Sequence, residues 1–322
     1  MIEKSLMLVI LLASTVMAQI PNKELYQHLQ DVSVTVKSFA GEGSGVIVTR
    51  EVTLSSGKKV KVNFVWTAAH VVDGLRSVRT IIKDGRSAKV VEFKDAQIVK
   101  ELVENGRRVG EIKMEAKVIK YSDSENIEDL ALLMIRKKGF IDKTATFHVS
   151  DEPVPIGTEL YHVGSLLGQI GSNSMTRGIL SQVGRVLDLG TGDGVIFDQT
   201  SCPGFPGSSG GGVFLSEKNK GHEGHYVGML VRGAGETFNL IVPVRRMRKY
   251  AKANGILWAL DQNVPTPAYD ELLKLPIEGT IDSKGGKDER SSKTSKDFPF
   301  LFRYNTTPRQ ISPFLPRRPV EN

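Results

Sequence analysis

Three residues of this chain have the types that nucleophilic catalysis needs: Ser209, His70 and Asp129. Ser209 lies in the string PGSSGGG, whose glycines allow a tight turn and a close approach of backbone amides to a substrate. A serine hydroxyl is a weak nucleophile, so it needs a base to take its proton, an acid to orient that base, and amides to stabilise an oxyanion. These residue types predict attack on a carbonyl carbon by Ser209.

Two apolar segments are expected to position the base and the acid. His70 follows the run Phe64–Ala69, which predicts a buried strand that holds the imidazole rigidly at its end. Asp129 directly precedes the apolar run Leu130–Ile135, so a second strand would anchor the carboxylate against an imidazole N–H. Taken alone, His70 could be an ordinary hydrogen-bonded histidine at the end of a strand, and Asp129 could be an ordinary turn residue. The three together predict a catalytic triad.

The order of the three residues along the chain separates two hydrolase folds. The string GSSGG also fits the nucleophile elbow of α/β-hydrolases, in which the acid and the histidine follow the serine. Only His222 and His225 follow Ser209 here, in a turn rich in glycine and lysine, so the order excludes that fold. These two histidines have an H-x-x-H spacing, but no further ligands are evident, and no metal site is predicted.

Seven segments in order resemble the trypsin-like serine proteases, most closely the HtrA/Deg-like branch. They are GEGSGVIVT, TAAHVVDG, EDLALL, YHVGSLLGQIGSNSMTRGILSQVGR, FDQTSCPGFPGSSGGGVF, VGMLVRG and NLIVPV, and the resemblance spans roughly Val32 to Ala251. The resemblance implies an all-β fold of two six-stranded antiparallel β-barrels with the triad in the cleft between them. Short β-rich runs between turn residues agree with it, and Val244–Asn254 reads as a short basic C-terminal helix.

Two segments extend this plan. TREVTLSSGKKVKVNF, with a turn at Ser55–Lys58, predicts an extended hairpin, and a charged segment is inserted between Val90 and Val118.

The resemblance also implies a mechanism and a binding pocket. Ser209 would form an acyl-enzyme, and the backbone amides of Gly207 and Ser209 would form the oxyanion hole. Enzymes that cleave after Lys or Arg carry an acid six positions before the serine, where this chain has Pro203. The predicted substrate-binding residues are Pro203, Met229, Leu230, Val231, Arg232 and Gly233. This mostly apolar wall predicts a preference for small or medium aliphatic P1 residues, and Arg232 leaves an acidic preference open.

The composition limits the classes of binding partner that are expected. The formal charge of +7 is spread along the chain without the aromatic and arginine pattern of a nucleic-acid binder, so polypeptide substrates are expected and nucleic acid is not. Membrane association is not indicated, and no cofactor is needed. The single cysteine, Cys202, excludes an internal disulfide and is expected to be a structural thiol. The alternatives to an endopeptidase are a chaperone-like binding module on the same fold and an esterase.

The two ends of the chain differ from the middle. Residues 1–18 resemble a signal peptide, with an apolar run Leu6–Ala13 and cleavage after Ala18, which predicts a secreted or periplasmic protein. The protease domain is expected to span residues 19–254. Residues 255–322 are predicted to form a low-complexity, largely disordered tail without a PDZ domain, apart from a short helix near Tyr269–Leu275. The resemblance implies a trimer, but the segment Gln19–Asp31 is short for a trimer contact, so monomer and trimer are both left open.

Overall fold

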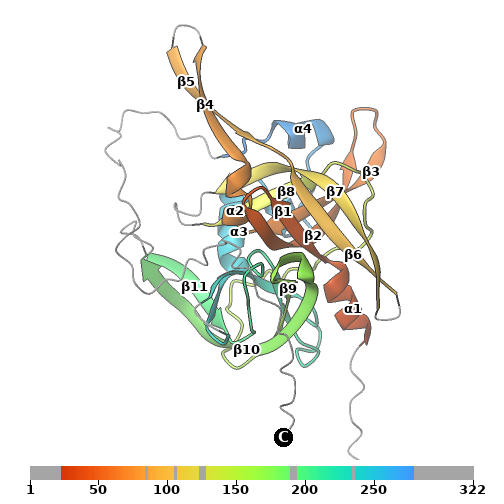
Figure 1. The fold of residues 1–322 in the computed structure, drawn as a ribbon, viewed down its shortest axis with the longest axis vertical. Coiled ribbons are helices and arrows are strands. Elements are labelled where there is room, and N and C mark those ends of the chain that lie inside the picture. Colours follow the sequence, from red (N-terminus) through yellow and green to blue (C-terminus); the bar gives the residue numbers. More distant parts are fainter. Residues whose placement is uncertain are drawn as a thin grey trace, which may run out of the picture.

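A computed structural model describes residues 23–83, 86–104, 107–122, 128–188, 194–233 and 236–278 of the chain (Figure 1). Strands dominate it, and they form two closed barrels that lie one above the other in the view of Figure 1. The predicted signal peptide and the segment from residue 279 onward lie outside the described residues.

The first barrel is closed in the order β1-β2-β3-β8-β7-β6, and all its strand pairs are antiparallel. Its strands are β1 (Ser33–Ser38), β2 (Gly41–Thr53), β3 (Lys59–Thr67), β6 (Ala96–Glu104), β7 (Arg107–Ser122) and β8 (Leu130–Ile135). Every residue of β8 is buried, so both faces of this strand are covered by other parts of the chain. β2 and β3 form the extended hairpin predicted from the sequence.

The second barrel is closed in the order β10-β11-β14-β13-β12-β9, again with antiparallel pairs. Its strands are β9 (Glu159–Leu166), β10 (Gly171–Asp188), β11 (Gly194–Thr200), β12 (Gly212–Leu215), β13 (Tyr226–Gly233) and β14 (Asn239–Pro243), and a 3₁₀ turn, η2 (Gly168–Ile170), joins β9 to β10. The predicted fold of two six-stranded antiparallel barrels is confirmed.

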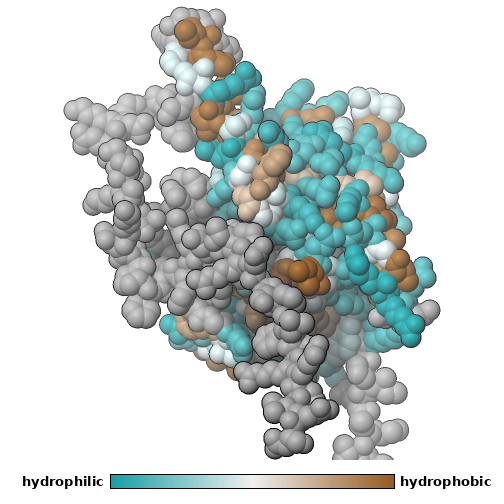
Figure 2. Space-filling model, viewed as in Figure 1, coloured by the Kyte–Doolittle hydropathy of each residue, from teal (hydrophilic) through white to brown (hydrophobic). Residues whose placement is uncertain are grey.

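A separate hairpin stands away from the first barrel. After α2 (Ala69–Val72) and the 3₁₀ turn η1 (Asp73–Leu75), the strands β4 (Arg76–Lys83) and β5 (Arg86–Phe93) pair only with each other, and Figure 1 shows them projecting beyond the barrel. Val78 and Ile82 on β4 are exposed. Elsewhere on the face in Figure 2, hydrophilic residues prevail and hydrophobic ones form small separate groups. The charged segment inserted after Val90 continues from β5 into the β6–β7 hairpin of the barrel wall.

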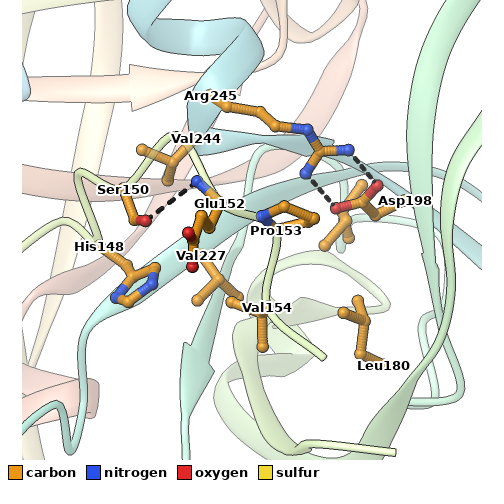
Figure 3. Close-up of a pocket in the computed structure, with 11 residues that line it drawn as sticks. His148, Ser150, Glu152, Pro153, Val154, Leu180, Asp198, Val227, Val244 and Arg245 are labelled. Carbon is orange, nitrogen blue, oxygen red and sulfur yellow. Dashed lines mark hydrogen bonds and ion pairs between the residues drawn. The ribbon is translucent and has the colours of Figure 1, made fainter. Parts of the chain in front are cut away.

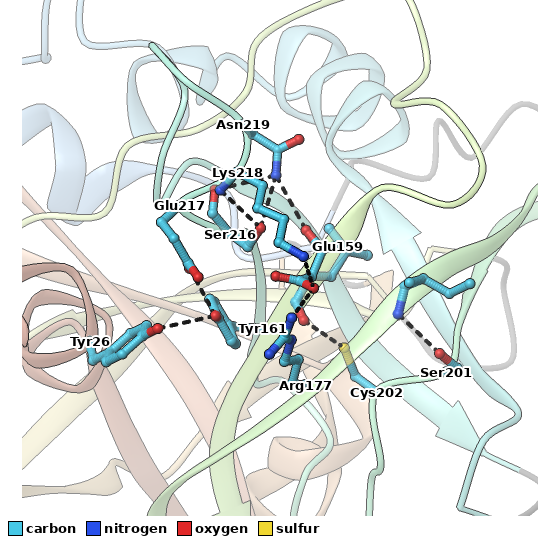
Figure 4. Close-up of polar contacts among 12 residues, drawn as sticks. Tyr26, Glu159, Tyr161, Arg177, Ser201, Cys202, Ser216, Glu217, Lys218 and Asn219 are labelled. Atoms are coloured by element: carbon cyan, nitrogen blue, oxygen red, sulfur yellow. Dashed lines mark hydrogen bonds and ion pairs between the residues drawn. The ribbon is translucent and has the colours of Figure 1, made fainter. Parts of the chain in front are cut away.

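An N-terminal helix, α1 (Lys23–Asp31), precedes the first barrel but also contacts the second. Its apolar residues Leu25 and Leu29 are buried. Tyr26 meets Tyr161 of β9 edge to face, with ring centroids 5.4 Å apart and hydroxyl oxygens 3.3 Å apart (Figure 4). The Tyr161 hydroxyl donates in turn to the Glu217 carboxylate over 2.8 Å. The sequence did not suggest this helix, because nine residues form a stable helix only when tertiary contacts cover their apolar face.

The predicted C-terminal helix is confirmed as α3 (Val244–Ala253). Arg245 on α3 and Asp198 on β11 form a paired ion bridge, with nitrogen to oxygen distances of 2.7 and 2.6 Å (Figure 3). The Asp198 side chain is nearly buried, and its carboxylate also accepts from the Gly184 N–H over 2.9 Å. The bridge fixes α3 against the second barrel.

Residues 255–278 pack onto the first barrel. They include the 3₁₀ turn η3 (Leu257–Ala259) and α4 (Tyr269–Lys274), which agrees with the short helix expected there; no strand follows α3 in the part of the chain that the structure describes. Trp258 is buried, its ring 4.7 Å from that of Phe64, and Trp66 donates from Nε1 to the Ala259 carbonyl over 3.0 Å. The packed domain therefore extends beyond the boundary expected at residue 254.

This packing predicts that Trp258 is part of the folding unit. Trp258→Ala removes a large buried ring from between η3 and Phe64. We expect it to lower the free energy of unfolding by about 3–5 kcal/mol, measured by urea denaturation. Trp258→Phe, which keeps a ring at this position, should cost clearly less. A Trp258→Ala loss below about 0.5 kcal/mol, as at exposed sites, would show that this segment is dispensable.

Candidate active site

His70 lies in the short helix α2, directly after β3. The strand ends at Thr67, so the imidazole is held by a helical turn and not by the end of the strand itself. Ala69 and Val71 on either side of His70 are buried and fix this turn, whereas the His70 side chain is 34 % exposed. The ring is thus anchored on one side and open to solvent on the other.

Asp129 lies directly before β8 and is almost completely buried. Its φ of 53° falls in the left-handed region, which aspartate adopts more readily than most residues. The His70 Nδ1–H group faces both carboxylate oxygens, at 3.0 and 2.9 Å, and the His70 backbone N–H donates to Oδ1 over 3.1 Å. The carboxylate therefore fixes both the tautomer and the position of the imidazole.

A residue of the second barrel holds the loop that carries Asp129. Arg246 on α3 donates from Nε to the Glu128 carboxylate over 2.9 Å, and its guanidinium carbon lies 4.8 Å from the centre of the Phe197 ring. The Arg246 side chain is only 9 % exposed, so the ion pair is shielded from water. In the sequence Glu128 precedes Asp129 and Arg246 lies in the predicted basic helix, but no sequence pattern links the two residues.

The charges around His70 and Asp129 oppose the effect of burial. Burial alone would lower the pKa of His70, but the charge of Asp129 and its hydrogen bond outweigh burial and raise it above the ordinary value. Burial would raise the pKa of Asp129, but the charge and hydrogen bonds of His70 lower it, so the carboxylate stays ionised. The positive charge of Arg232 lowers the pKa of both groups.

The serine loop packs directly against the segment that carries His70. A Cβ on Gly210 would stand 2.1 Å from the Ser44 carbonyl oxygen and 3.0 Å from the Ala68 nitrogen. A Cβ on Gly43 would stand 2.5 Å from Val71 and 3.0 Å from the Ser209 carbonyl oxygen. Only glycine fits these contacts, so the glycines let Ser209 approach the α2 segment.

Ser44 on β2 ties the serine loop to the first barrel. Its backbone N–H donates to the Ser209 carbonyl over 2.7 Å, and its hydroxyl donates to the Gly207 carbonyl over 2.7 Å. The same hydroxyl oxygen accepts from the Ser165 N–H over 2.7 Å. Sequence analysis missed Ser44, although it lies in the segment GEGSGVIVT that carries part of the resemblance.

Two amides of the serine loop are left without acceptors. The amides of Ser208 and Gly210 donate to the carbonyls of Phe205 and Leu230, over 2.9 and 2.8 Å. The N–H groups of Gly207 and Ser209 donate to no other described residue, and neither does the Ser209 hydroxyl. Gly207 has a φ of 92°, a conformation that favours glycine. These two amides are available to a ligand, as an oxyanion hole requires.

The predicted pocket wall is more buried than expected. Met229 and Val231 lie in one hydrophobic core cluster and Leu230 in another, each at most 4 % exposed. Of the predicted wall, Pro203, Arg232 and Gly233 are partly exposed. The Arg232 Nε atom is buried and has no hydrogen-bond partner among the described residues.

Asn239, which sequence analysis missed, joins the two sides of the predicted pocket. It is 1 % exposed, and its Nδ2 donates to the Cys202 carbonyl over 2.9 Å. A Cβ on Gly204 would stand 3.2 Å from its Oδ1, and one on Gly233 2.2 Å. Asn239 is neutral, as is Pro203, whose carbonyl accepts from Thr176. These residues provide no carboxylate to pair with a basic substrate side chain.

Cys202 beside this pocket is a structural thiol. Its sulfur is buried and donates weakly to the Leu160 carbonyl over 3.5 Å (Figure 4). Burial raises the pKa of the thiol to about 11, so it is not ionised near neutral pH.

Two closed six-stranded barrels with a glycine-rich serine loop packed against both are the architecture of trypsin-like hydrolases. Residues 43–221 match the family described as trypsin-like peptidase domain, and the chain belongs to this family.

Its curated relatives are HtrA-type proteases. The chain is 24 % identical over 234 residues to serine protease Do-like HtrA of Lactobacillus helveticus, covering 72 % of this chain and 43 % of that protein. It is 35 % identical over 100 residues to serine protease Do-like HtrB of Bacillus subtilis strain 168, covering 30 % of this chain and 21 % of that protein. The matches span less than half the length of these relatives.

A solved structure supports the fold. The inactive form of a mutant of Rv3671c from M. tuberculosis H37Rv superposes with a TM-score of 0.50 at 16 % identity, covering 76 % of this chain and 94 % of that one.

The geometry predicts how His70 titrates. In Ser209→Ala protein, NMR of the imidazole protons should give His70 a pKa above about 6.5, the value of a free histidine. Adding Asp129→Asn should lower this pKa, because burial then acts without the opposing charge. Adding Arg232→Met should raise it, because a nearby positive charge is removed.

Arg79→Met, on the projecting hairpin, is the matched control and should leave the His70 pKa unchanged. An Asp129→Asn protein with the His70 pKa of its parent would refute the assigned interaction.

Proposed function

We propose that this protein is a serine endopeptidase that cleaves peptide bonds through an acyl-enzyme. The observation that carries the proposal is the hydrogen bond between the buried Asp129 carboxylate and His70. Beside it lies a serine loop in which the N–H groups of Gly207 and Ser209 donate to no other described residue. The family supports it, as do relatives named serine proteases.

The proposed reaction begins when Ser209 Oγ attacks the peptide carbonyl carbon and His70 Nε2 takes its proton. Asp129 stays ionised and holds the Nδ1–H group in place. The amides of Gly207 and Ser209 stabilise the negative oxygen of the tetrahedral intermediate, and losing one such donor costs about 3 kcal/mol of transition-state stabilisation.

His70 then gives its proton to the leaving amine, and the acyl group remains on Ser209. Water attacks this ester with His70 again as base, and the acid product leaves. Ser209 Oγ and His70 are not hydrogen-bonded to each other in this structure, and such bonds commonly form only when substrate binds.

The proposed substrates are unfolded or extracytoplasmic polypeptides. Leu167 and Phe205 flank the serine loop and expose apolar side chains, 59 % and 40 % respectively, and the Leu167 N–H donates to the Pro206 carbonyl over 2.7 Å. Apolar groups exposed around the nucleophile suit extended segments that a folded substrate would bury. Neither Pro203 nor Asn239 carries a carboxylate, which supports aliphatic P1 residues over basic ones.

We also propose that the protein is exported, on the strength of the N-terminal sequence. Cleavage after Ala18 would leave only residues 19–22 before α1. No helix in the described part of the chain is long and apolar enough to span a membrane. A homotrimer, which the resemblance implies, would need a surface other than the apolar face of α1, because Leu25 and Leu29 are already buried within the chain.

A fluorophosphonate probe tests the nucleophile. The protein expressed from the full-length sequence should take one label on Ser209 and cleave unfolded casein. If it is exported as proposed, mass spectrometry of the mature protein should give Gln19 as its first residue. Ser209→Ala should abolish labelling and cleavage, and Ser208→Ala should still be labelled, because Ser208 is buried and its hydroxyl is bonded to the Phe205 amide.

Failure of the folded wild type to take the label would overturn the enzyme proposal. If Ser209→Ala nevertheless suppressed aggregation of casein as well as the wild type, the chaperone-like alternative would be favoured. Labelling with cleavage of esters but not of peptides would favour an esterase.

A peptide library tests the pocket. Cleavage should concentrate after Val, Ala, Leu or Ile, because neither Pro203 nor Asn239 offers a carboxylate to a basic P1 side chain. Predominant cleavage after Lys or Arg would contradict this reading, and predominant cleavage after Asp or Glu would assign the pocket to Arg232.

A further inference from the structure

Three histidines, one of which is far from the other two in the sequence, meet beside the second barrel. One nitrogen of each of His148, His222 and His225 lies within 4.8 Å of one nitrogen of each of the others. The ring centroids of His222 lie 5.2 Å from His148 and 5.1 Å from His225. The H-x-x-H pair thus gains a third histidine that the sequence could not reveal.

The backbone holds the three histidines in place. The His148 N–H donates to the Tyr226 carbonyl over 2.9 Å, and the Tyr226 N–H donates to the Thr146 carbonyl over 2.7 Å. His222 and His225 lie in the turn between β12 and β13, where the His225 N–H donates to the His222 carbonyl over 3.1 Å. The segment that joins the two barrels is therefore fixed beside this turn.

The chemistry of the cluster suits a transition metal. Histidine imidazoles are the commonest metal ligands in proteins, and each ring here offers one ligand nitrogen to the cluster. His148 and His225 are partly buried and His222 is exposed, so an ion can enter from solution.

The geometry needs little adjustment. Zinc to nitrogen bonds of about 2.0–2.1 Å in a tetrahedral site place the nitrogens about 3.3 Å apart, so each pair here would close by at most about 1.5 Å. Rotation of the rings can supply much of this movement. His148 also borders a small cavity that Ser150 and Glu152 help to line (Figure 3), but His222 and His225 do not line it.

We propose that His148, His222 and His225 bind one divalent transition metal ion, of which Zn²⁺ is the expected one. Imidazole ligands suit zinc, and three protein ligands leave one position for water or another group. The ion would cross-link the segment between the barrels (residues 136–158) to the β12–β13 turn. This role is structural and independent of the proposed chemistry at Ser209.

Zinc binding by the full-length Ser209→Ala protein tests the site. After EDTA treatment and dialysis, titration with ZnCl₂ alone should give one ion per chain, confirmed by elemental analysis after gel filtration. Zinc should also raise the thermal midpoint. His222→Gln, which changes an exposed ligand, should weaken zinc affinity at least about 10-fold, and His148→Gln should do the same.

Two controls separate this site from other histidines. His28→Gln on α1 and His70→Gln at the candidate active site should both leave zinc affinity unchanged. Absence of stoichiometric zinc, or equal affinity in the His222→Gln, His148→Gln and parent proteins, would overturn the proposal. Loss of zinc in His70→Gln alone would assign the ion to the candidate active site instead.

Discussion

The candidate site depends on one buried charge, the carboxylate of Asp129. A buried carboxylate is costly unless it is hydrogen-bonded and paired, and here His70 supplies both through its ring and its backbone N–H. Asp129 also has a left-handed backbone conformation, so the loop must be held in place by its surroundings. The Glu128–Arg246 pair provides that restraint from the second barrel. His70 and Asp129 both lie beside strands of the first barrel. Their arrangement nevertheless also depends on α3, which packs against the second barrel.

The serine loop contacts the first barrel through two glycines. Gly43 and Gly210 allow the serine loop to lie against β2 and α2, and Ser44 adds the hydrogen bonds that a flat glycine contact lacks. A Cβ at either glycine would overlap atoms of the opposite segment. Because no larger side chain fits at these two positions, the contact holds the serine loop in one place relative to the α2 segment that carries His70.

The parts of the fold set by local pattern could be predicted, and the parts set by distant contacts could not. The strands and the β2–β3 hairpin follow from β-rich runs between turn residues, and α3 follows from a short basic segment with a helical pattern. His70 and Asp129 were predicted from motifs, and the structure brings them together. Arg246, Asn239 and His148 act through partners dozens of residues away, which no single window of sequence displays. Residues 255–278 looked like a tail because their main anchor, Trp258, packs against a strand formed near the start of the chain.

The position of α1 has a consequence for the order of folding. The helix is the first element in the described part of the chain, but Tyr26 and Gln30 contact Tyr161 and Asn173, well over a hundred residues later. A chain made from its N-terminus can complete the first barrel while these partners are still missing. Because closing so long a loop is slow compared with forming local hairpins, α1 would dock late. The first segment of the domain to be synthesised would then be among the last to reach its native place.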